Sequence, residues 1–121
     1  MRVLIGVDGS AGSAAAVHFV GRLLHRDRDQ LLLYYSPPAV AIRGQATKDA
    51  DARTSVRAAL AERVFEQSRA ELSAELRDGV ETVAGMQKAK DGLLIAADKY
   101  RSDLIVVGSR GAGMFQRLTM G

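Results

Sequence analysis

The sequence predicts an α/β fold in which an open parallel β-sheet carries helices on both faces. Short apolar runs that end in glycine, serine or proline alternate along the chain with longer segments of helical periodicity. The clearest run, Leu104 to Val107, leads directly into a glycine-rich segment, as expected of a buried parallel strand that feeds a loop. Strands separated by helices pair in parallel through right-handed crossovers, so we expect helices to cover both faces of the sheet.

The first strand is expected at Val3 to Val7, which is apolar apart from its glycine, and Asp8-Gly9-Ser10 ends it. Ser10 is a candidate helix N-cap, because its hydroxyl can accept a hydrogen bond from an N–H group one turn later. An apolar helical stripe follows, made of Ala14, Val17, Gly21 and Leu24. His18 and His25 fall on other faces and have no second ligand at a metal-like spacing, so we expect them at the surface.

The second strand is expected at Gln30 to Tyr35, and Ser36-Pro37-Pro38 ends it. The stretch from Ala39 to about Ala50 has no periodicity, and a loop of this length predicts a functional or mobile segment, which we interpret as a flap. One long amphipathic helix is expected next, ending near Gly79 in a left-handed C-terminal cap. Its apolar stripe comprises Val56, Leu60, Val64, Phe65, Leu72 and Leu76, and its wetter faces carry Arg57, Glu62, Arg63, Glu66, Arg69 and Glu71.

The last part of the chain predicts two more strands joined by a helix. Val80 to Ala84 alternates weakly between apolar and polar residues, which favours a strand near the sheet edge. The helix that docks on the sheet is expected from the spacing of Ala89, Leu93, Ala96, Ala97 and Tyr100, and the strand Leu104 to Val107 completes the order. In such sheets ligands bind at the carboxyl ends of the strands, where the strand order reverses.

Composition bounds the function. With 121 residues, 47% hydrophobic and 26% charged, the chain is expected to form a single domain over residues 1–121. It has no cysteine, which excludes disulfides, thiolate nucleophiles and zinc–thiolate sites. No apolar run is long enough to span a membrane and no signal peptide is evident, so the expected location is cytoplasmic. The net charge is +3, and the 17 basic residues are interleaved along the chain with 14 acidic ones. This pattern gives little support to a nucleic-acid-binding surface.

Two glycine groups deserve separate tests as phosphate motifs. Met114 and Phe115 stand where a P-loop needs Lys and Ser or Thr, and the group around Gly9 does not have the G-x-G-x-x-G spacing. The spacing that remains is Gly108-x2-Gly111-x9-Gly121. Together with Val3-Leu-Ile-Gly-Val-Asp-Gly-Ser10, this spacing resembles the universal stress protein family, specifically its ATP-binding branch, along the whole chain.

The resemblance implies a Rossmann-like fold of the adenine nucleotide alpha hydrolase type. It also implies an ATP site at the strand ends, with Mg²⁺ as a companion ion and phosphates on the loop from Gly108 to Gly113. In the family a residue near the end of the second strand offers backbone atoms to the base, and alignment through the apolar run makes that residue Tyr35. The candidate nucleotide-binding residues are Asp8, Gly9, Ser10, Tyr35, Gly108, Ser109, Arg110, Gly111, Gly113 and Gly121.

Several of these residues have a structural alternative. Asp8 can accept hydrogen bonds from an adenine amino group or a ribose hydroxyl, but a turn and helix start would use the same carboxylate. Tyr35 is equally explained by packing in a strand. Arg110 can pair with phosphate as a bidentate guanidinium or can be a solvated loop residue, and the direction of the Ser109 hydroxyl is open.

The chain departs from the family pattern at its end and before its last helix. The family has Ser or Thr after the last glycine, then a helix and a final strand that commonly pairs across a dimer; none of these is in this sequence. We expect the sequence to be part of a longer chain, because four strands alone would leave an edge and a face of the sheet uncovered. Where relatives have a Gly-x-Pro turn, this chain has Gln87-Lys88-Ala89 after Gly85.

Two functions remain open at this point. The favoured one is an ATP-binding regulatory module for stress adaptation that works with a homodimer or other protein partner. No catalytic or metal-ligating residue is assigned: the glycine loop has no carboxylate, Lys or His to activate water, so ATP turnover, if any, should be slow. The alternative is a family member that binds no nucleotide and acts through dimerisation and protein contacts.

Overall fold

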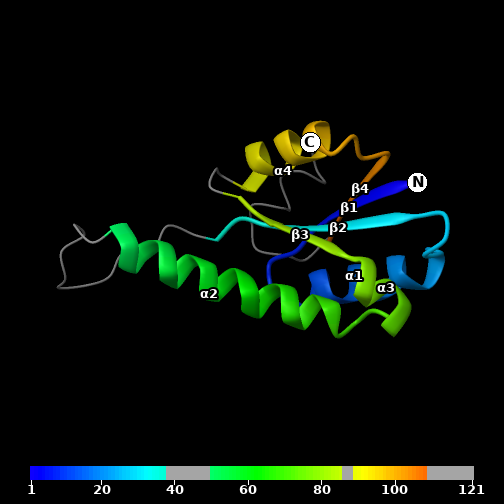
Figure 1. The fold of residues 1–121 in the computed structure, drawn as a ribbon, viewed down its shortest axis with the longest axis horizontal. Coiled ribbons are helices and arrows are strands. Elements are labelled where there is room, and N and C mark those ends of the chain that lie inside the picture. The colour runs from blue at the N-terminus through cyan, green and yellow to red at the C-terminus, as the bar shows by residue number, and fades with distance from the viewer. Residues whose placement is uncertain (38–49, 86–88, 109–121) are drawn as a thin grey trace.

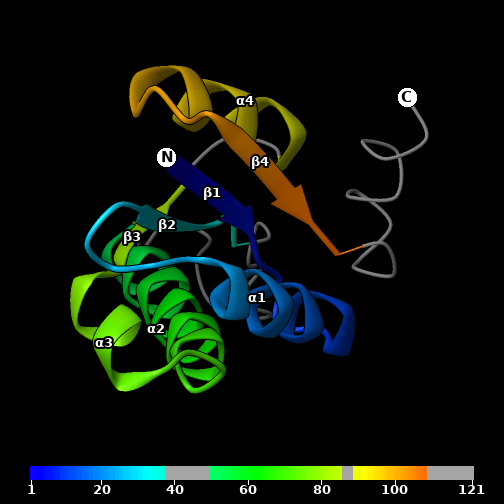
Figure 2. The same cartoon turned by 90° about the vertical axis from the view of Figure 1, so that its right-hand side faces the viewer.

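The computed structural model describes residues 1–37, 50–85 and 89–108, which form a four-stranded sheet between two layers of helices (Figures 1 and 2). Helices α1, α2 and α3 cover one face of the sheet and α4 covers the other. The predicted α/β fold, with helices on both faces, is confirmed. In chain order the elements are β1 (Arg2–Gly6), α1 (Ala11–Leu23), β2 (Gln30–Tyr35), α2 (Ala50–Arg69), α3 (Ala74–Gly79), β3 (Glu81–Ala84), α4 (Ala89–Lys99) and β4 (Leu104–Val107).

All strand pairs are parallel, and the strand order is β3-β2-β1-β4. The register pairs Ile5 of β1 with Leu33 of β2 on one side and with Val106 of β4 on the other. The first two crossovers lead from β1 to β2 and from β2 to β3. The third leads from β3 to β4, which pairs with β1 on the side away from β2. The strand order therefore reverses between β1 and β4, which is where open α/β sheets bind ligands.

The core lies on both faces of β1 and β2, because these two strands are central. Their burial follows from sequence: each is an almost unbroken apolar run, as a strand covered on both sides requires. Alternate side chains of β1 separate two clusters, with Ile5 facing α1 and α2 and Leu4 facing α4. The α1/α2/α3 side also contains Val17, Val20, Leu33, Val64, Phe65, Leu72 and Leu76, and the α4 side contains Leu32, Tyr34, Leu93, Ala96 and Ala97.

The start of α1 confirms the predicted cap. Ser10 has an extended backbone, and its Oγ accepts a hydrogen bond from the Ser13 amide at 3.1 Å. His18 and His25 are exposed, as expected, and His18 Nδ1 lies 3.6 Å from Glu71 Oε2.

The single long helix expected up to Gly79 is wrong, because the chain breaks after Arg69 into α2 and α3. Ser73 caps the new helix by accepting from the Leu76 amide at 3.4 Å, and the Arg77 guanidinium donates to the carbonyls of Arg69 (3.2 Å) and Leu72 (2.8 Å). The Arg77 side chain thus adds donors to carbonyls of the turn that joins α2 to α3. Gly79 is the last residue of α3 and does not adopt a positive φ, so the predicted left-handed cap is also wrong.

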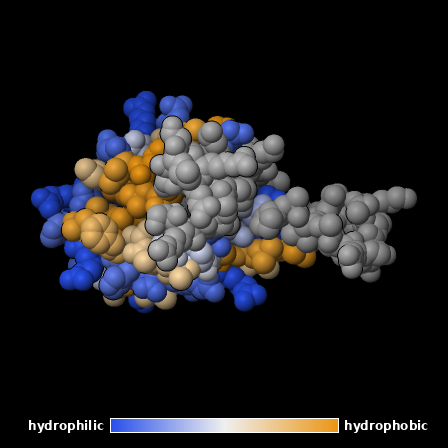
Figure 3. Space-filling view, turned by 180° about the vertical axis from the view of Figure 1, so that it is seen from behind, coloured by the Kyte–Doolittle hydropathy of each residue, from blue (hydrophilic) through white to orange (hydrophobic). Residues whose placement is uncertain are grey.

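The two outer strands are less buried than the sequence suggests. β3 lies at one edge, as expected from its weak alternation. The expectation that Leu104 to Val107 is buried is wrong: Leu104 is 46% exposed and Ile105 38% exposed. β4 has one strand neighbour among the described residues, so one side of it lacks cover there. Figure 3 looks onto this side of the molecule and shows apolar surface between the helix layers.

None of the described helices is long and apolar enough to cross a membrane.

Candidate functional site

The carboxyl ends of the four strands bring together residues from distant parts of the chain. Asp8 follows β1, Tyr35 ends β2, Gly85 follows β3 and Gly108 follows β4. Because parallel strands end at the same edge, neighbouring positions in this row are about 5 Å apart across the sheet. The described part of the predicted site therefore lies along the carboxyl ends of the strands. The reversal of strand order between β1 and β4 falls within it.

Asp8 shapes the turn between β1 and α1. Its Oδ1 accepts a hydrogen bond from the Ser10 amide at 2.9 Å, and its own amide donates to Ser13 Oγ at 3.3 Å. This is the structural role that the sequence left open for the carboxylate. It fixes the Asp8 side chain at the carboxyl end of β1. The carboxylate is half-buried at this position.

Gly9 and Ser10 complete the turn. Gly9 has φ +80°, a conformation that side-chain-bearing residues adopt at a cost, although a Cβ there would meet Val64 Cγ2 only at an ordinary 3.4 Å. The reason for glycine at this position is therefore conformational and not steric. The Ser10 oxygen is engaged in the helix cap, so a ligand can receive only its remaining hydroxyl capacity.

Gly108 brings the end of β4 against the first turn of α1. A Cβ on Gly108 would lie 2.7 Å from the Gly12 carbonyl carbon and 2.9 Å from the Ser13 nitrogen, which are backbone atoms that cannot swing away. Glycine is thus required for this close approach. The approach places the β4 loop start beside the N-terminal end of a 13-residue helix whose first turn holds no acidic residue. Such a helix end carries a partial positive charge and N–H groups suited to anions.

Tyr35 connects the ends of β1 and β2 with α2. Its half-buried ring meets the Phe65 ring edge-on, with centroids 6.4 Å apart and planes at 87°. Burial raises the pKa of Tyr35, the Asp8 carboxylate raises this pKa further, and the Arg57 guanidinium lowers it. The phenol therefore lies within electrostatic reach of an acidic and a basic group. The contact with Phe65 confirms the packing role that the sequence left open for Tyr35, and its ligand-binding role stays a prediction.

Arg57 is the residue that sequence reasoning missed. The helical pattern assigned it to a wetter face of α2, but it is half-buried, and its Nη2 donates to the Gly85 carbonyl at 3.3 Å. Gly85 in turn donates its amide to the Tyr35 carbonyl at 2.8 Å, which extends the β2–β3 ladder. The signal that could have indicated the site is the pair of small residues that ends β3, Ala84 and Gly85, because they leave space opposite α2.

A cavity of about 130 Å³ lies beside this contact, between the first half of α2 and the ends of β2 and β3. Its accessible walls are almost entirely apolar, and the hydrogen bond between Arg57 and the Gly85 carbonyl lies next to it. A side chain at Gly85 would collide with the buried Tyr34 hydroxyl, so glycine is needed here for packing. The lining residues are Pro37, Thr54, Arg57, Ala58, Ala84 and Gly85.

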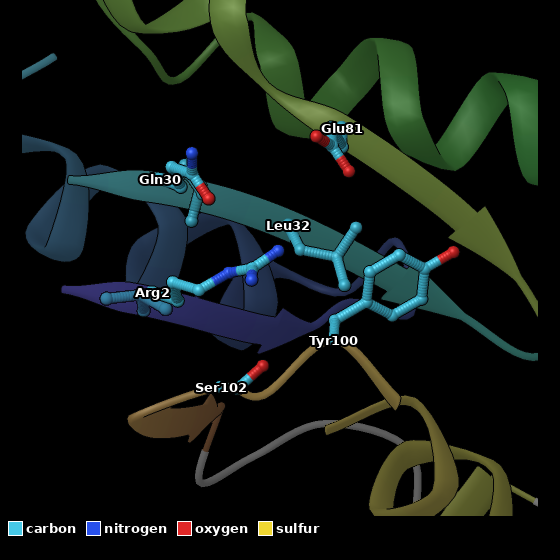
Figure 4. A pocket seen from close by; sticks show the side chains of 8 residues that line it. Arg2, Gln30, Leu32, Glu81, Tyr100 and Ser102 are labelled. Carbon is cyan, nitrogen blue, oxygen red and sulfur yellow. The ribbon is translucent and has the colours of Figure 1, made fainter. Parts of the chain in front are cut away.

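The opposite end of the sheet has a pocket of a different kind, shown in Figure 4. Arg2, Gln30 and Glu81 stand at the amino ends of β1, β2 and β3, and Tyr100 and Ser102 close it from the α4 side. Its volume of about 10 Å³ matches roughly one water molecule. A nucleotide does not fit there.

Five predicted site residues lie outside the described residues: Ser109, Arg110, Gly111, Gly113 and Gly121. The flap expected between Ala39 and Ala50 also falls almost wholly outside them, as does the turn at Gln87-Lys88. Within residues 1–37, 50–85 and 89–108, no group of three or more His, Asp or Glu side chains is arranged to hold a metal ion.

Comparison with known proteins decides the family. The family model described as "Universal stress protein family" matches residues 1–121. The chain belongs to the universal stress protein family. The comparison with curated proteins gave no match.

Solved structures of universal stress proteins share the fold. A family protein from Burkholderia pseudomallei aligns with a TM-score of 0.68 at 20% identity, covering 98% of this chain and 87% of that one. A universal stress protein in complex with cAMP aligns at 0.62 and 20% identity over 100% and 85% of the two chains. An Arabidopsis thaliana family protein with AMP bound aligns at 0.59 and 19% identity over 93% and 79%. At these identities the likeness establishes the fold of this universal stress protein.

Proposed function

We propose that this universal stress protein is an ATP-binding regulatory module, with the nucleotide lying across the carboxyl ends of the parallel strands. The observation that carries the proposal is the position of Asp8, Tyr35 and Gly108 at the carboxyl ends of three neighbouring strands, β1, β2 and β4, where the strand order reverses between β1 and β4. Two proteins of the same fold were solved with adenine nucleotides, one with cAMP and one with AMP, which supports binding of an adenine nucleotide by this protein.

Each described residue has a task in this proposal. The Asp8 carboxylate accepts hydrogen bonds from a ribose hydroxyl or the base, while its bond to Ser10 keeps it in place. Tyr35 contributes to the base side of the site. The N-terminal end of α1, held against Gly108, favours the phosphates through its N–H groups and partial positive charge. The glycine loop from Gly108 to Gly113, with Ser109, Arg110 and Gly121, supplies further phosphate contacts, and Mg²⁺ accompanies ATP.

We assign a regulatory and not a catalytic role because the glycine loop has no side chain suited to activate water. The glycine loop offers no carboxylate, Lys or His to activate a water molecule, so the bound nucleotide acts as a signal and is turned over slowly. We place this module, as one domain over residues 1–121, in the cytoplasm and in a homodimer or with another protein partner. The nucleotide then reports a cellular state to that partner.

A second candidate function is protein contact without nucleotide, through dimerisation. One observation favours it: β4 is an outer strand among the described residues and exposes Leu104 and Ile105, and apolar side chains on an open strand edge favour pairing with another chain. Asp8 and Gly108 also have complete structural explanations that need no ligand.

Calorimetric titration with MgATP distinguishes the two candidates. We expect saturable heat from the wild-type protein and none from Gly111→Val, because a branched side chain in the glycine loop would block the approach of phosphate to the backbone. Far-UV circular dichroism should be unchanged in the variant. No heat from the wild-type protein would favour the dimerising, nucleotide-free function, and an unaltered affinity in Gly111→Val would remove the loop from the phosphate site.

A further inference from the structure

We propose that a pocket at the C-terminal end of α1 binds a small molecule with two ammonium groups and one carboxylate, the charge pattern of a free basic amino acid. The pocket lies between α1, the turn that joins α1 to β2, and the start of α3. Because α1 begins where Gly108 approaches Gly12 and runs back to the amino end of β2, the pocket is separate from the proposed nucleotide site and does not depend on it.

The pocket has the size of a small-molecule site. Its volume is about 570 Å³, within the range of about 300–1,000 Å³ that is usual for such sites. Leu24 and Leu76 contribute apolar surface, but most of the accessible lining is polar. The polar groups that line the pocket are therefore presented to whatever occupies it.

Charged side chains of both signs line the pocket without pairing. Arg26 and Asp27 come from the turn between α1 and β2, and Glu75 comes from the first turn of α3. All three are exposed, and within the part of the chain that the structure describes none of them forms an ion pair or a side-chain hydrogen bond. Opposite charges that share one pocket but do not pair with each other are available to a ligand that carries both signs.

The balance of charge in the lining favours a particular class of ligand. With His25 neutral, the lining carries two carboxylates and one guanidinium, so its net charge is −1. The C-terminal end of α1, which contributes Gly21 and Leu24, adds the partial negative charge of its last carbonyl groups. A complementary ligand has two cationic groups, for Asp27 and Glu75, and one carboxylate, which a guanidinium can bind bidentately. A basic amino acid such as lysine meets this requirement.

Hydrogen bonds hold the two turns that form the walls of the pocket. In the turn between α1 and β2, the His25 amide donates to the Asp29 carboxylate at 2.8 Å, and the His25 carbonyl accepts from the Asp29 amide at 2.8 Å. In the turn between α2 and α3, Ser73 caps α3 and the Arg77 guanidinium donates to the Leu72 carbonyl at 2.8 Å. The backbone of the pocket is therefore already formed, and binding has to order only the exposed side chains.

Titration with lysine, followed by amide chemical shifts, tests the proposal. We expect saturable changes at the amides of His25, Arg26, Asp27 and Glu75, which line the pocket. Norleucine lacks the side-chain ammonium, and 1,5-diaminopentane lacks the carboxylate. Each should bind at least about tenfold more weakly than lysine, the loss expected for one hydrogen bond to a charged group.

Substitutions assign the two charges of the ligand to residues of the pocket. Arg26→Met removes the guanidinium but keeps the apolar stem, so it should weaken lysine about tenfold without weakening 1,5-diaminopentane, which has no carboxylate. Glu75→Gln should weaken both ligands about tenfold. Arg22→Met and Asp78→Asn remove the same charges at exposed neighbouring positions outside the lining and should bind lysine like the wild type. Urea unfolding checks that each variant is folded.

The results that would overturn the proposal are distinct. No saturable change with lysine, or equal affinities for lysine, norleucine and 1,5-diaminopentane, would show that the pocket does not recognise both charges. Equal lysine affinity in wild type, Arg26→Met and Glu75→Gln would show that lysine binds elsewhere. No nucleotide enters this experiment, so its outcome leaves the proposed function untouched.

Discussion

Gly108 is the residue on which the junction between β4 and α1 depends. Its missing side chain lets the strand end approach the Gly12 carbonyl and the Ser13 amide, at distances where a Cβ would be 2.7 to 2.9 Å from backbone atoms. Gly108→Ala should therefore destabilise the fold by about 1–3 kcal/mol, the usual range for overpacking a tight contact. Urea unfolding followed by circular dichroism measures the change.

Gly79→Ala is the matched control for this substitution. Nothing lies within 4 Å of a Cβ on Gly79, and its φ is not positive, so alanine fits without strain. The loss of backbone freedom in the unfolded chain should make this variant more stable by about 0.4–1 kcal/mol. Equal stability of Gly108→Ala and the wild type would show that the β4 end does not press against α1 as described.

The elements of the fold depend on a helix break that local capping creates. Ser73→Ala should cost about 0.5–2 kcal/mol, since α3 is short and its cap satisfies the Leu76 amide. The sign of the effect is diagnostic: in one continuous helix the same change would increase stability, because alanine is the better helix former. Ser55→Ala, at an exposed position inside α2, controls for this propensity and should be neutral or slightly stabilising in urea unfolding.

The break also shows how far periodicity predicts elements. Leu72 and Leu76 continue the apolar spacing of α2, so the pattern predicts a single helix, although the two residues lie on either side of the Ser73 cap. Capping by Ser73 and by the Arg77 side chain depends on where the chain turns, which hydrophobic spacing does not record. By contrast, the strands β1 and β2 and the helices α1 and α4 were predicted correctly, because each packs a clear apolar run or stripe on the sheet.

The site was predictable only where it follows directly from strand order. Asp8, Gly9, Ser10, Tyr35 and Gly108 stand at strand ends, and a parallel sheet necessarily gathers such residues at one edge. Arg57 comes from the middle of the chain and reaches this edge because α2 crosses the ends of β2 and β3, a packing that the sequence does not specify. The sequence predicted that four strands would leave an edge uncovered but placed β4 among the buried strands, because an apolar run looks the same at the centre and at the edge of a sheet.

At the scale of the whole molecule, the sheet has two chemically different ends. The amino ends of the strands carry the small polar pocket at Arg2, Gln30 and Glu81, which has room for about one water molecule. The carboxyl ends carry the turn at Asp8, the glycine approach at Gly108 and the cavity beside Arg57. This asymmetry arises because all the strands run the same way, so every loop after a strand opens at the same end.

Amide chemical shifts on titration with AMP test which end binds the nucleotide. We expect shifts at the carboxyl edge, at Gly9, Tyr35, Gly85 and Gly108, because these amides lie beside the proposed base, ribose and phosphate positions. Amides at the other end should remain unchanged, because strands of four to six residues that rise about 3.3 Å per residue separate the two ends by about 13 to 20 Å. Inorganic phosphate at the same concentration is the control, and it should move the Gly108 amide but not that of Gly85. Chemical shift changes concentrated at the amino ends of the strands would contradict the proposal that the nucleotide binds at the carboxyl ends.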